Sequence, residues 1–94
     1  MANQTLEISE DFTIMNTLGL HARAAAAFVK IANRFQSDII VVKDESSVNG
    51  KSIMGVLMLA ASKDSTISIT AKGDDAKEAI EALRKLIEEK FGED

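Results

Sequence analysis

The strongest constraint on the fold is a change of hydrophobic period near the end of the chain. Between Ser65 and Ala71, isoleucine and alanine alternate with threonine and serine. This period of two predicts a strand with one solvated face, which favours an antiparallel sheet. After a turn at 72–74, where Asp75 and Glu78 have the spacing of a capping box, apolar residues recur about every 3.6 positions. They predict a helix that packs on the sheet, through Ala76, Ala79, Ile80, Leu83, Ile87 and Phe91.

Earlier in the chain, a period of two predicts a strand at 6–15 and an apolar stripe predicts a helix at 22–35. A β-branched run predicts a strand at 39–42, and a weak strand is predicted at 47–49. An apolar run after Ser52 predicts a short helix at 53–60. With the later strand and helix, the predicted order is βαββαβα. We therefore expect one α+β domain over residues 1–94, with residues 1–6 as an N-terminal extension. Its fold is an open-faced sandwich, a four-stranded antiparallel sheet with three helices packed on one face.

The composition argues against several classes of protein. The 94 residues suffice for one small domain with a single core. Without cysteine, the chain has no disulfide framework or thiolate metal site, and a single histidine makes a zinc site improbable. No apolar run approaches the ~18 residues that span a bilayer. A net charge of -4 argues against nonspecific nucleic-acid binding. We expect a cytoplasmic monomer without metal, cofactor or membrane insertion.

The single histidine, His21, lies where a loop gives way to an alanine-rich helix. Gly19 can adopt a positive φ and so allows a tight turn before it. At a helix start the backbone N–H groups lack intrahelical partners and the helix dipole favours an anion. The guanidinium of Arg23 could bind phosphate oxygens there through its planar fork. These features predict an anion-binding site.

A neutral imidazole is also a competent nucleophile at physiological pH, which gives His21 a second chemical capacity. A structural interpretation competes with this one, because a lone histidine near a helix start is often only a surface or capping residue. The physical features of the segment leave both interpretations open.

Two motifs of the chain resemble those of a known family. One is Asn16-x-x-Gly19-Leu20-His21-Ala22-Arg23, before an alanine-rich helix, and the other is Lys51-Ser52-Ile53-Met54-Gly55. On these motifs the chain resembles the HPr family, the histidine-containing phosphocarriers of the bacterial phosphoenolpyruvate:sugar phosphotransferase system (PTS). The resemblance runs from about Phe12 to the last helix. It implies the same open-faced sandwich.

The resemblance also implies roles for individual residues. His21 would accept a phosphoryl group from phosphorylated enzyme I and pass it to enzyme IIA domains, with Arg23 stabilising the phosphate. The chain would then be a phosphoryl carrier and not an enzyme. Ala24 replaces the proline that the family usually has after the arginine. Because alanine also suits a first helical turn, the helix is expected to form, while the transfer rate and the branch served stay open.

Ser52 stands directly before a predicted short helix and is expected to cap its first turn. The resemblance implies a second role, because in many bacteria the matching serine is phosphorylated by a dedicated ATP-dependent kinase, HPr kinase/phosphorylase. The carrier then regulates carbon metabolism, with a transcriptional regulator as a further partner. A phosphate there would add negative charge beside the helix and weaken partner docking.

The short helix is apolar nearly all round and cannot bury every face, so part of it is expected to dock partners. The predicted docking residues are Leu20, Ile53, Met54 and Leu57. Two other functions stay open: a carrier of a regulatory or nitrogen-related PTS branch, and a small regulatory domain that binds an anionic metabolite without covalent modification.

Overall fold

The computed structural model describes residues 6–93, and its sheet has the predicted antiparallel form. Four strands lie in the order β1-β4-β2-β3, so the first strand in sequence is at one edge. Their bounds are β1 Glu7–Thr13, β2 Asp38–Lys43, β3 Ser46–Asn49 and β4 Thr66–Lys72. The predicted extension at residues 1–6 lies outside the described residues except for Leu6, whose carbonyl accepts a hydrogen bond from Gly73.

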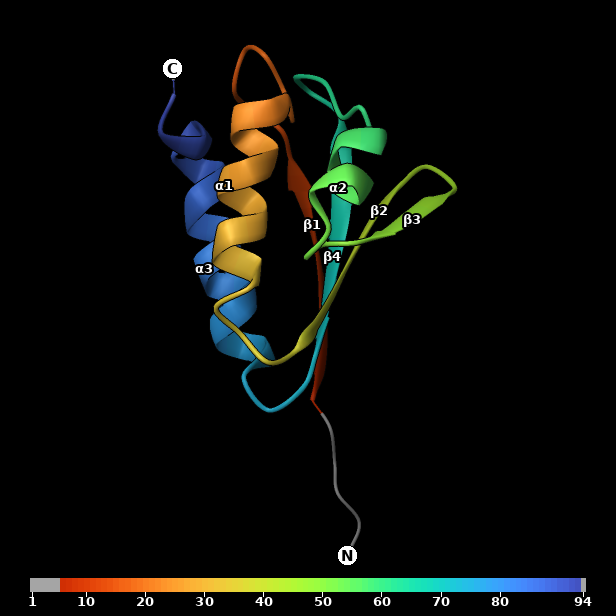
Figure 1. The fold of residues 1–94 in the computed structure, drawn as a ribbon, viewed down its shortest axis with the longest axis vertical. Helices are drawn as coiled ribbons and strands as arrows, with labels where there is room; N and C mark the ends of the chain where they lie inside the picture. The colour runs from red at the N-terminus through yellow and green to blue at the C-terminus, as the bar shows by residue number, and fades with distance from the viewer. Residues whose placement is uncertain (1–5, 94) are drawn as a thin grey trace, which may run out of the picture.

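Three helices cover one face of this sheet and confirm the predicted βαββαβα order (Figure 1). The helices are α1 Ala22–Ala32, α2 Ile53–Met58 and α3 Ala76–Glu88. The two longer helices lie side by side, and α1 packs against both α2 and α3. The start of α1 and the C-terminal end of the chain lie at the same end of the molecule (Figure 1), so residues far apart in sequence can meet there.

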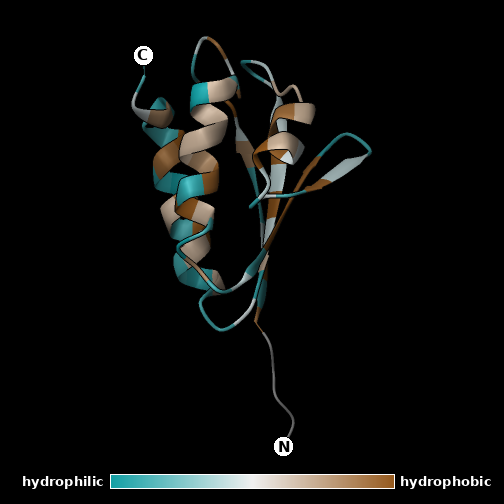
Figure 2. Ribbon diagram, in the orientation of Figure 1, coloured by the Kyte–Doolittle hydropathy of each residue, from teal (hydrophilic) through white to brown (hydrophobic). Residues whose placement is uncertain are grey.

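One hydrophobic cluster holds the helices to the sheet. Phe28 of α1, Val56 of α2 and Leu83 of α3 are fully buried against Ile67 and Ile69 of β4. Hydrophilic and hydrophobic residues alternate along α3, as expected of an amphipathic helix, while α2 is mostly apolar (Figure 2). No helix within residues 6–93 is long and apolar enough to cross a membrane.

All three helices end earlier than the sequence predicts. The first stops at Ala32 because the following N–H groups of Arg34 and Phe35 bond three residues back, to Ile31 and Ala32, which tightens the chain into a turn. The second ends at Met58 and not at residue 60. The third ends at Glu88, and a short 3₁₀ helix, η1 Lys90–Gly92, follows it and buries Phe91.

The predicted capping box at the start of α3 is wrong. Asp75 is the residue before the helix, but its side chain makes no capping hydrogen bond. Both carboxylate oxygens instead accept hydrogen bonds from the α1–β2 connection, at the backbone N–H groups of Gln36 and Ser37 and at the Ser37 hydroxyl. A tertiary contact therefore takes the place of the local cap.

Candidate functional site

The approach to His21 is fixed by a glycine. Gly19 has φ +67, as the sequence predicts, and a Cβ atom there would collide with the carbonyl oxygen of Ala61. The next residue, Leu20, donates its N–H to that same oxygen at 2.8 Å. The loop is therefore held so closely to the 61–62 segment that only glycine fits.

His21 is the N-cap of α1, with extended backbone angles (φ -75, ψ -177). Its carbonyl accepts the helical hydrogen bond from Ala25 at 2.8 Å. Its Nδ1 lies 3.3 Å from the backbone nitrogen of Arg23 and accepts that N–H. The imidazole is partly exposed, with 29% of the side chain accessible. One ring nitrogen thus lies at a helix start, where the backbone N–H groups have no intrahelical partner and an anion is favoured.

The other ring nitrogen meets the end of the chain. Nε2 of His21 lies 2.8 and 2.9 Å from the two carboxylate oxygens of Glu93. The buried Asn16 donates from Nδ2 to Glu93 Oε1 at 3.1 Å and to the carbonyl of Gly19 at 2.8 Å. These contacts join the two ends of the candidate site across more than seventy residues of sequence.

Sequence reasoning missed Glu93 as a site residue. Nothing in the local pattern near the C-terminus marks it, because its role depends on η1 folding back beside α1. Asn16 belongs to the motif that carries the family resemblance, but its contact with Glu93 is visible only in the fold. An asparagine that is entirely buried in a loop, as Asn16 is, needs polar partners.

Arg23 lies in the first turn of α1 with an exposed side chain. Within residues 6–93 its guanidinium forms no hydrogen bond or ion pair, so it is available to an incoming anion. The next residue, Ala24, is fully buried in that same turn. Alanine in place of the family's usual proline therefore leaves the helix start formed.

Ser52 is the N-cap of α2, as predicted, and its Oγ accepts the N–H of Gly55 at 3.1 Å. The residue is only partly buried. The neighbouring Lys51 does not project freely into solvent, because its ammonium donates to the carbonyl of Phe35 at 2.7 Å. This bond ties the segment before α2 to the connection between α1 and β2.

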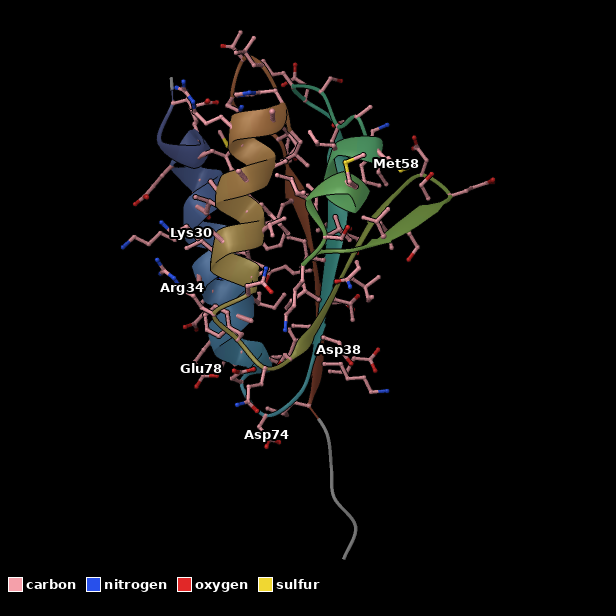
Figure 3. The ribbon with its side chains drawn as sticks, in the orientation of Figure 1. Lys30, Arg34, Asp38, Met58, Asp74 and Glu78 are labelled. Atoms are coloured by element: carbon pink, nitrogen blue, oxygen red, sulfur yellow. The ribbon has the colours of Figure 1, made fainter. Side chains whose placement is uncertain are left out.

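The predicted docking residues divide into two groups. Ile53 and Met54 are 41% and 64% exposed, whereas Leu20 is only 4% exposed and belongs to the core. Leu20 therefore offers almost no surface to a partner, because its side chain packs within the hydrophobic core. Leu57 is partly buried. Sequence reasoning also missed Leu18 and Met58, which are 69% and 76% exposed; Met58 projects outward from α2 (Figure 3).

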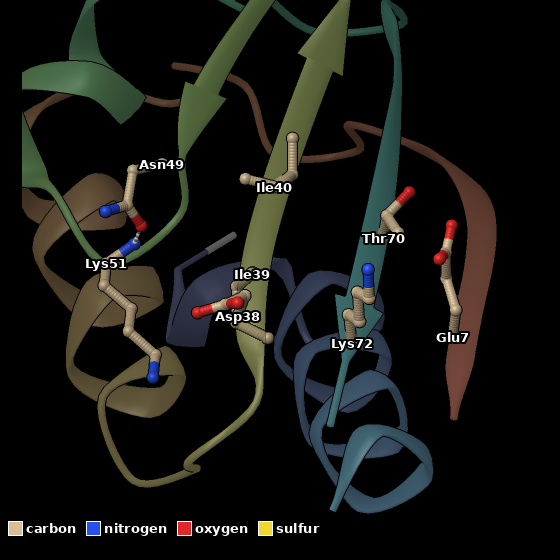
Figure 4. Close-up of a pocket in the computed structure, with 8 residues that line it drawn as sticks. All are labelled: Glu7, Asp38, Ile39, Ile40, Asn49, Lys51, Thr70 and Lys72. Carbon is tan, nitrogen blue, oxygen red and sulfur yellow. Dashed lines mark hydrogen bonds between the residues drawn. The ribbon is translucent and has the colours of Figure 1, made fainter. Parts of the chain in front are cut away.

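One cavity lies apart from these residues. It has a volume of about 400 Å³ and is on the helix-free face of the sheet, with Glu7, Asp38 and Lys72 among its lining residues (Figure 4). These three side chains stand in one row, because Lys72 pairs with Glu7 on one side and with Asp38 on the other. His21, Arg23 and Ser52 do not line it.

Known proteins are similar to this chain over most of its length. A family model described as "PTS HPr component phosphorylation site" matches residues 8–89. The phosphocarrier protein HPr of Neisseria meningitidis serogroup A is 48% identical over 86 residues, which are 92% of this chain and 97% of that protein.

Solved structures extend the similarity to the fold. The crystal structure of HPr from Thermoanaerobacter tengcongensis matches with a TM-score of 0.89 at 49% identity, covering 93% of this chain and 98% of the other. The Bacillus subtilis catabolite repression protein Crh, described as a swapped dimer, matches with a TM-score of 0.71 at 42% identity over 95% of each chain. With these matches along nearly its whole length, the chain belongs to the HPr family of PTS phosphocarrier proteins.

Proposed function

We propose that this carrier accepts a phosphoryl group on Nδ1 of His21 from phosphorylated enzyme I and passes it to enzyme IIA domains. The observation that carries the proposal is the position of Nδ1, which lies beside the first turn of α1 and accepts the N–H of Arg23. An acceptor nitrogen has a lone pair available for attack. The surrounding N–H groups and the free guanidinium favour the negative charge that arrives.

The transfer step follows from this geometry. The Nδ1 lone pair attacks the phosphorus of the donor phosphohistidine, the donor P–N bond breaks, and its electron pair returns to the donor imidazole. The Arg23 N–H is then released from Nδ1 and can donate to a phosphoryl oxygen, as can the guanidinium of the same residue. Positioning and charge stabilisation are the contributions of this chain. Each partner supplies the other histidine, so the chain acts as a carrier and not as an enzyme.

Ser52 is proposed as a second, regulatory phosphorylation site for an HPr kinase/phosphorylase, which would bring a transcriptional regulator among the partners. The partial exposure of this residue supports the proposal. Phosphorylation would place roughly -1.5 to -2 charges next to Ile53 and Met54. Negative charge beside an apolar docking surface opposes an acidic partner and adds a desolvation cost. The two phosphorylations should therefore antagonise each other.

We propose Ile53, Met54 and the exposed part of Leu57 as the docking surface for enzyme I and the IIA domains. The exposure of the first two supports this, because large apolar side chains on a surface commonly mark partner sites. The carrier is proposed to act as a cytoplasmic monomer, without nucleic acid, metal or cofactor.

Intact-mass analysis tests the carrier function directly. The wild-type protein and His21→Ala are incubated with phosphoenolpyruvate and enzyme I, then weighed before and after mild acid. One acid-labile phosphoryl group that needs His21 supports the proposal. Running the assay with enzyme I of the sugar branch and of the nitrogen branch decides which branch the carrier serves. Saturable phosphate-ester binding without covalent uptake from either would favour the alternative of a metabolite-binding regulatory domain.

A further inference from the structure

The two nitrogens of the His21 ring have partners of opposite kinds. Nε2 faces the Glu93 carboxylate, which can only accept a hydrogen bond, so the ring proton belongs on Nε2. Nδ1 faces the N–H of Arg23, which can only donate, so Nδ1 must be unprotonated. The two contacts therefore specify the same neutral tautomer, assigned from the hydrogen-bond network.

Asn16 holds the Glu93 carboxylate in this position. Its Nδ2 donates to Glu93 and to the carbonyl of Gly19, whereas its Oδ1 is buried without a hydrogen-bond partner in the described part of the chain. Turning the amide over would place Oδ1 against a carboxylate and a carbonyl, both acceptors. The orientation of Asn16 is therefore determined by the two bonds that it makes, and an unpaired buried oxygen is retained to keep them.

The turn that delivers Glu93 has unusual backbone geometry. Lys90, Phe91 and Gly92 have φ values of 57, 58 and 77, a run of three residues in the left-handed region. Residues other than glycine seldom adopt it, and where they do the surrounding structure must hold them. Here Phe91 is anchored in the core at 7% exposure, and the N–H of Glu93 bonds the Lys90 carbonyl at 2.9 Å. The carboxylate is thus held in place by a packed turn.

We propose that Glu93, held by Asn16, is a positioning residue that keeps the proton of His21 on Nε2 throughout phosphoryl transfer. This inference rests on the carrier function proposed above. With the proton on Nε2, Nδ1 can attack phosphorus without first losing a proton, and no proton need move as the P–N bond forms. The positive charge that develops on the phosphorylated ring faces a carboxylate 2.8 Å from Nε2. Because the proton stays on Nε2, the ring leaves as a neutral imidazole when the phosphoryl group passes to the next acceptor.

The tautomer of His21 is the first readout, and it needs no phosphoryl donor. We would compare the ring ¹⁵N spectra of wild type, Glu93→Gln and Glu93→Ala above neutral pH, with Glu88→Gln as a control for charge on the exposed face of α3. Wild type and Glu88→Gln should show the proton on Nε2. Glu93→Ala should show a several-fold larger population with the proton on Nδ1. Glu93→Gln keeps an acceptor oxygen and should largely retain the wild-type tautomer.

The second readout is the rate of phosphoryl uptake from phosphorylated enzyme I. The uptake rate of Glu93→Ala should be roughly tenfold lower than that of wild type, a smaller loss than removal of a fully enclosed stabilising group causes. The uptake rate of Glu93→Gln should lie between those of Glu93→Ala and wild type. The variants must keep the wild-type unfolding midpoint. Asn16→Asp tests the same contact independently, because its carboxylate repels that of Glu93.

The outcomes separate this inference from the carrier function. A wild-type tautomer population and uptake rate in Glu93→Ala would overturn the inference while leaving the carrier function intact. A wild type with the proton on Nε2 that takes up no phosphoryl group would refute the carrier function, and the inferred role in transfer with it. A tautomer shift with a slower rate in Glu93→Ala, neither of them seen in Glu88→Gln, supports both.

Discussion

Asp75 binds Ser37 twice through the same carboxylate oxygen, at 2.9 Å from the backbone nitrogen and 2.5 Å from the hydroxyl. Its second oxygen accepts the N–H of Gln36 at 2.9 Å. The contact joins the start of α3 to the connection between α1 and β2. The two longer helices and the sheet are therefore tied together at the end of the molecule opposite His21 (Figure 1).

This contact predicts a pH dependence of stability. The hydrogen bond from the Ser37 hydroxyl, followed by the bond from the Gln36 N–H, holds the pKa of Asp75 below its ordinary value of 3.8. A carboxyl whose pKa is lower in the folded state stabilises the fold above its unfolded-state pKa. That contribution is lost as the pH falls through the folded-state pKa. Asp75→Asn should thus be less stable than wild type at pH 7, and the difference should shrink below about pH 4.

Urea unfolding at pH 7, 5 and 3 measures this effect. Asp74→Asn is the matched control, because Asp74 is the exposed neighbouring residue in the same turn (Figure 3). A stability loss in Asp75→Asn that is equal at all three pH values would contradict the proposed origin in the ionised carboxylate.

Asp75 also shows why the helices and strands could be predicted better than the helix ends and caps. The alternation at 65–71 and the helical period after it depend on burial against the sheet, and the structure confirms both elements. Helix ends and caps depend on single hydrogen bonds. The partners of Asp75 lie 38 and 39 residues away, where no local pattern can indicate them.

The candidate site divides in the same way. Local rules predict His21 at the start of α1, a positive φ at Gly19 and Ser52 as a cap. The structure confirms these three positions. Glu93 could not be predicted, since it reaches His21 only through the packing of Phe91. The burial of Leu20 was missed because an apolar residue beside a loop can face either way.

Gly19 offers a test of how the loop before His21 is held. Gly19→Ala would place a Cβ against the Ala61 carbonyl and force alanine into a positive φ. We expect a loss of roughly 2–5 kcal/mol in the free energy of unfolding, from backbone strain and steric overlap together. Gly92→Ala is the control, because its φ is +77 but nothing lies within 4 Å of the added atom. It should cost only about 1–2 kcal/mol. Equal losses in the two variants would show that the close approach to Ala61 is unimportant.

Ser52 allows its structural and regulatory roles to be separated. Ser52→Ala removes the oxygen that accepts the Gly55 N–H and should lower the free energy of unfolding by about 1 kcal/mol. Ser52→Asp keeps a capping oxygen and adds charge, so its stability should stay within about 0.5 kcal/mol of wild type. If charge at this position controls docking, only Ser52→Asp should raise the KM for the carrier in the enzyme I reaction. A raised KM in Ser52→Ala alone would instead point to the loss of the cap.

The exposed side chains of α2 can be tested for docking without disturbing the core. Met54 is 64% exposed, so Met54→Ala should change the free energy of unfolding by no more than about 0.5 kcal/mol. If partners bind this surface, the same variant should raise the KM for the carrier with enzyme I by roughly fivefold, as expected for about 1 kcal/mol of lost contact. Ile40→Ala supplies the control, because Ile40 is also exposed but lines the cavity on the helix-free face of the sheet (Figure 4). Similar KM changes in both variants would argue against a docking surface on α2. A KM change in Met54→Ala alone would support one.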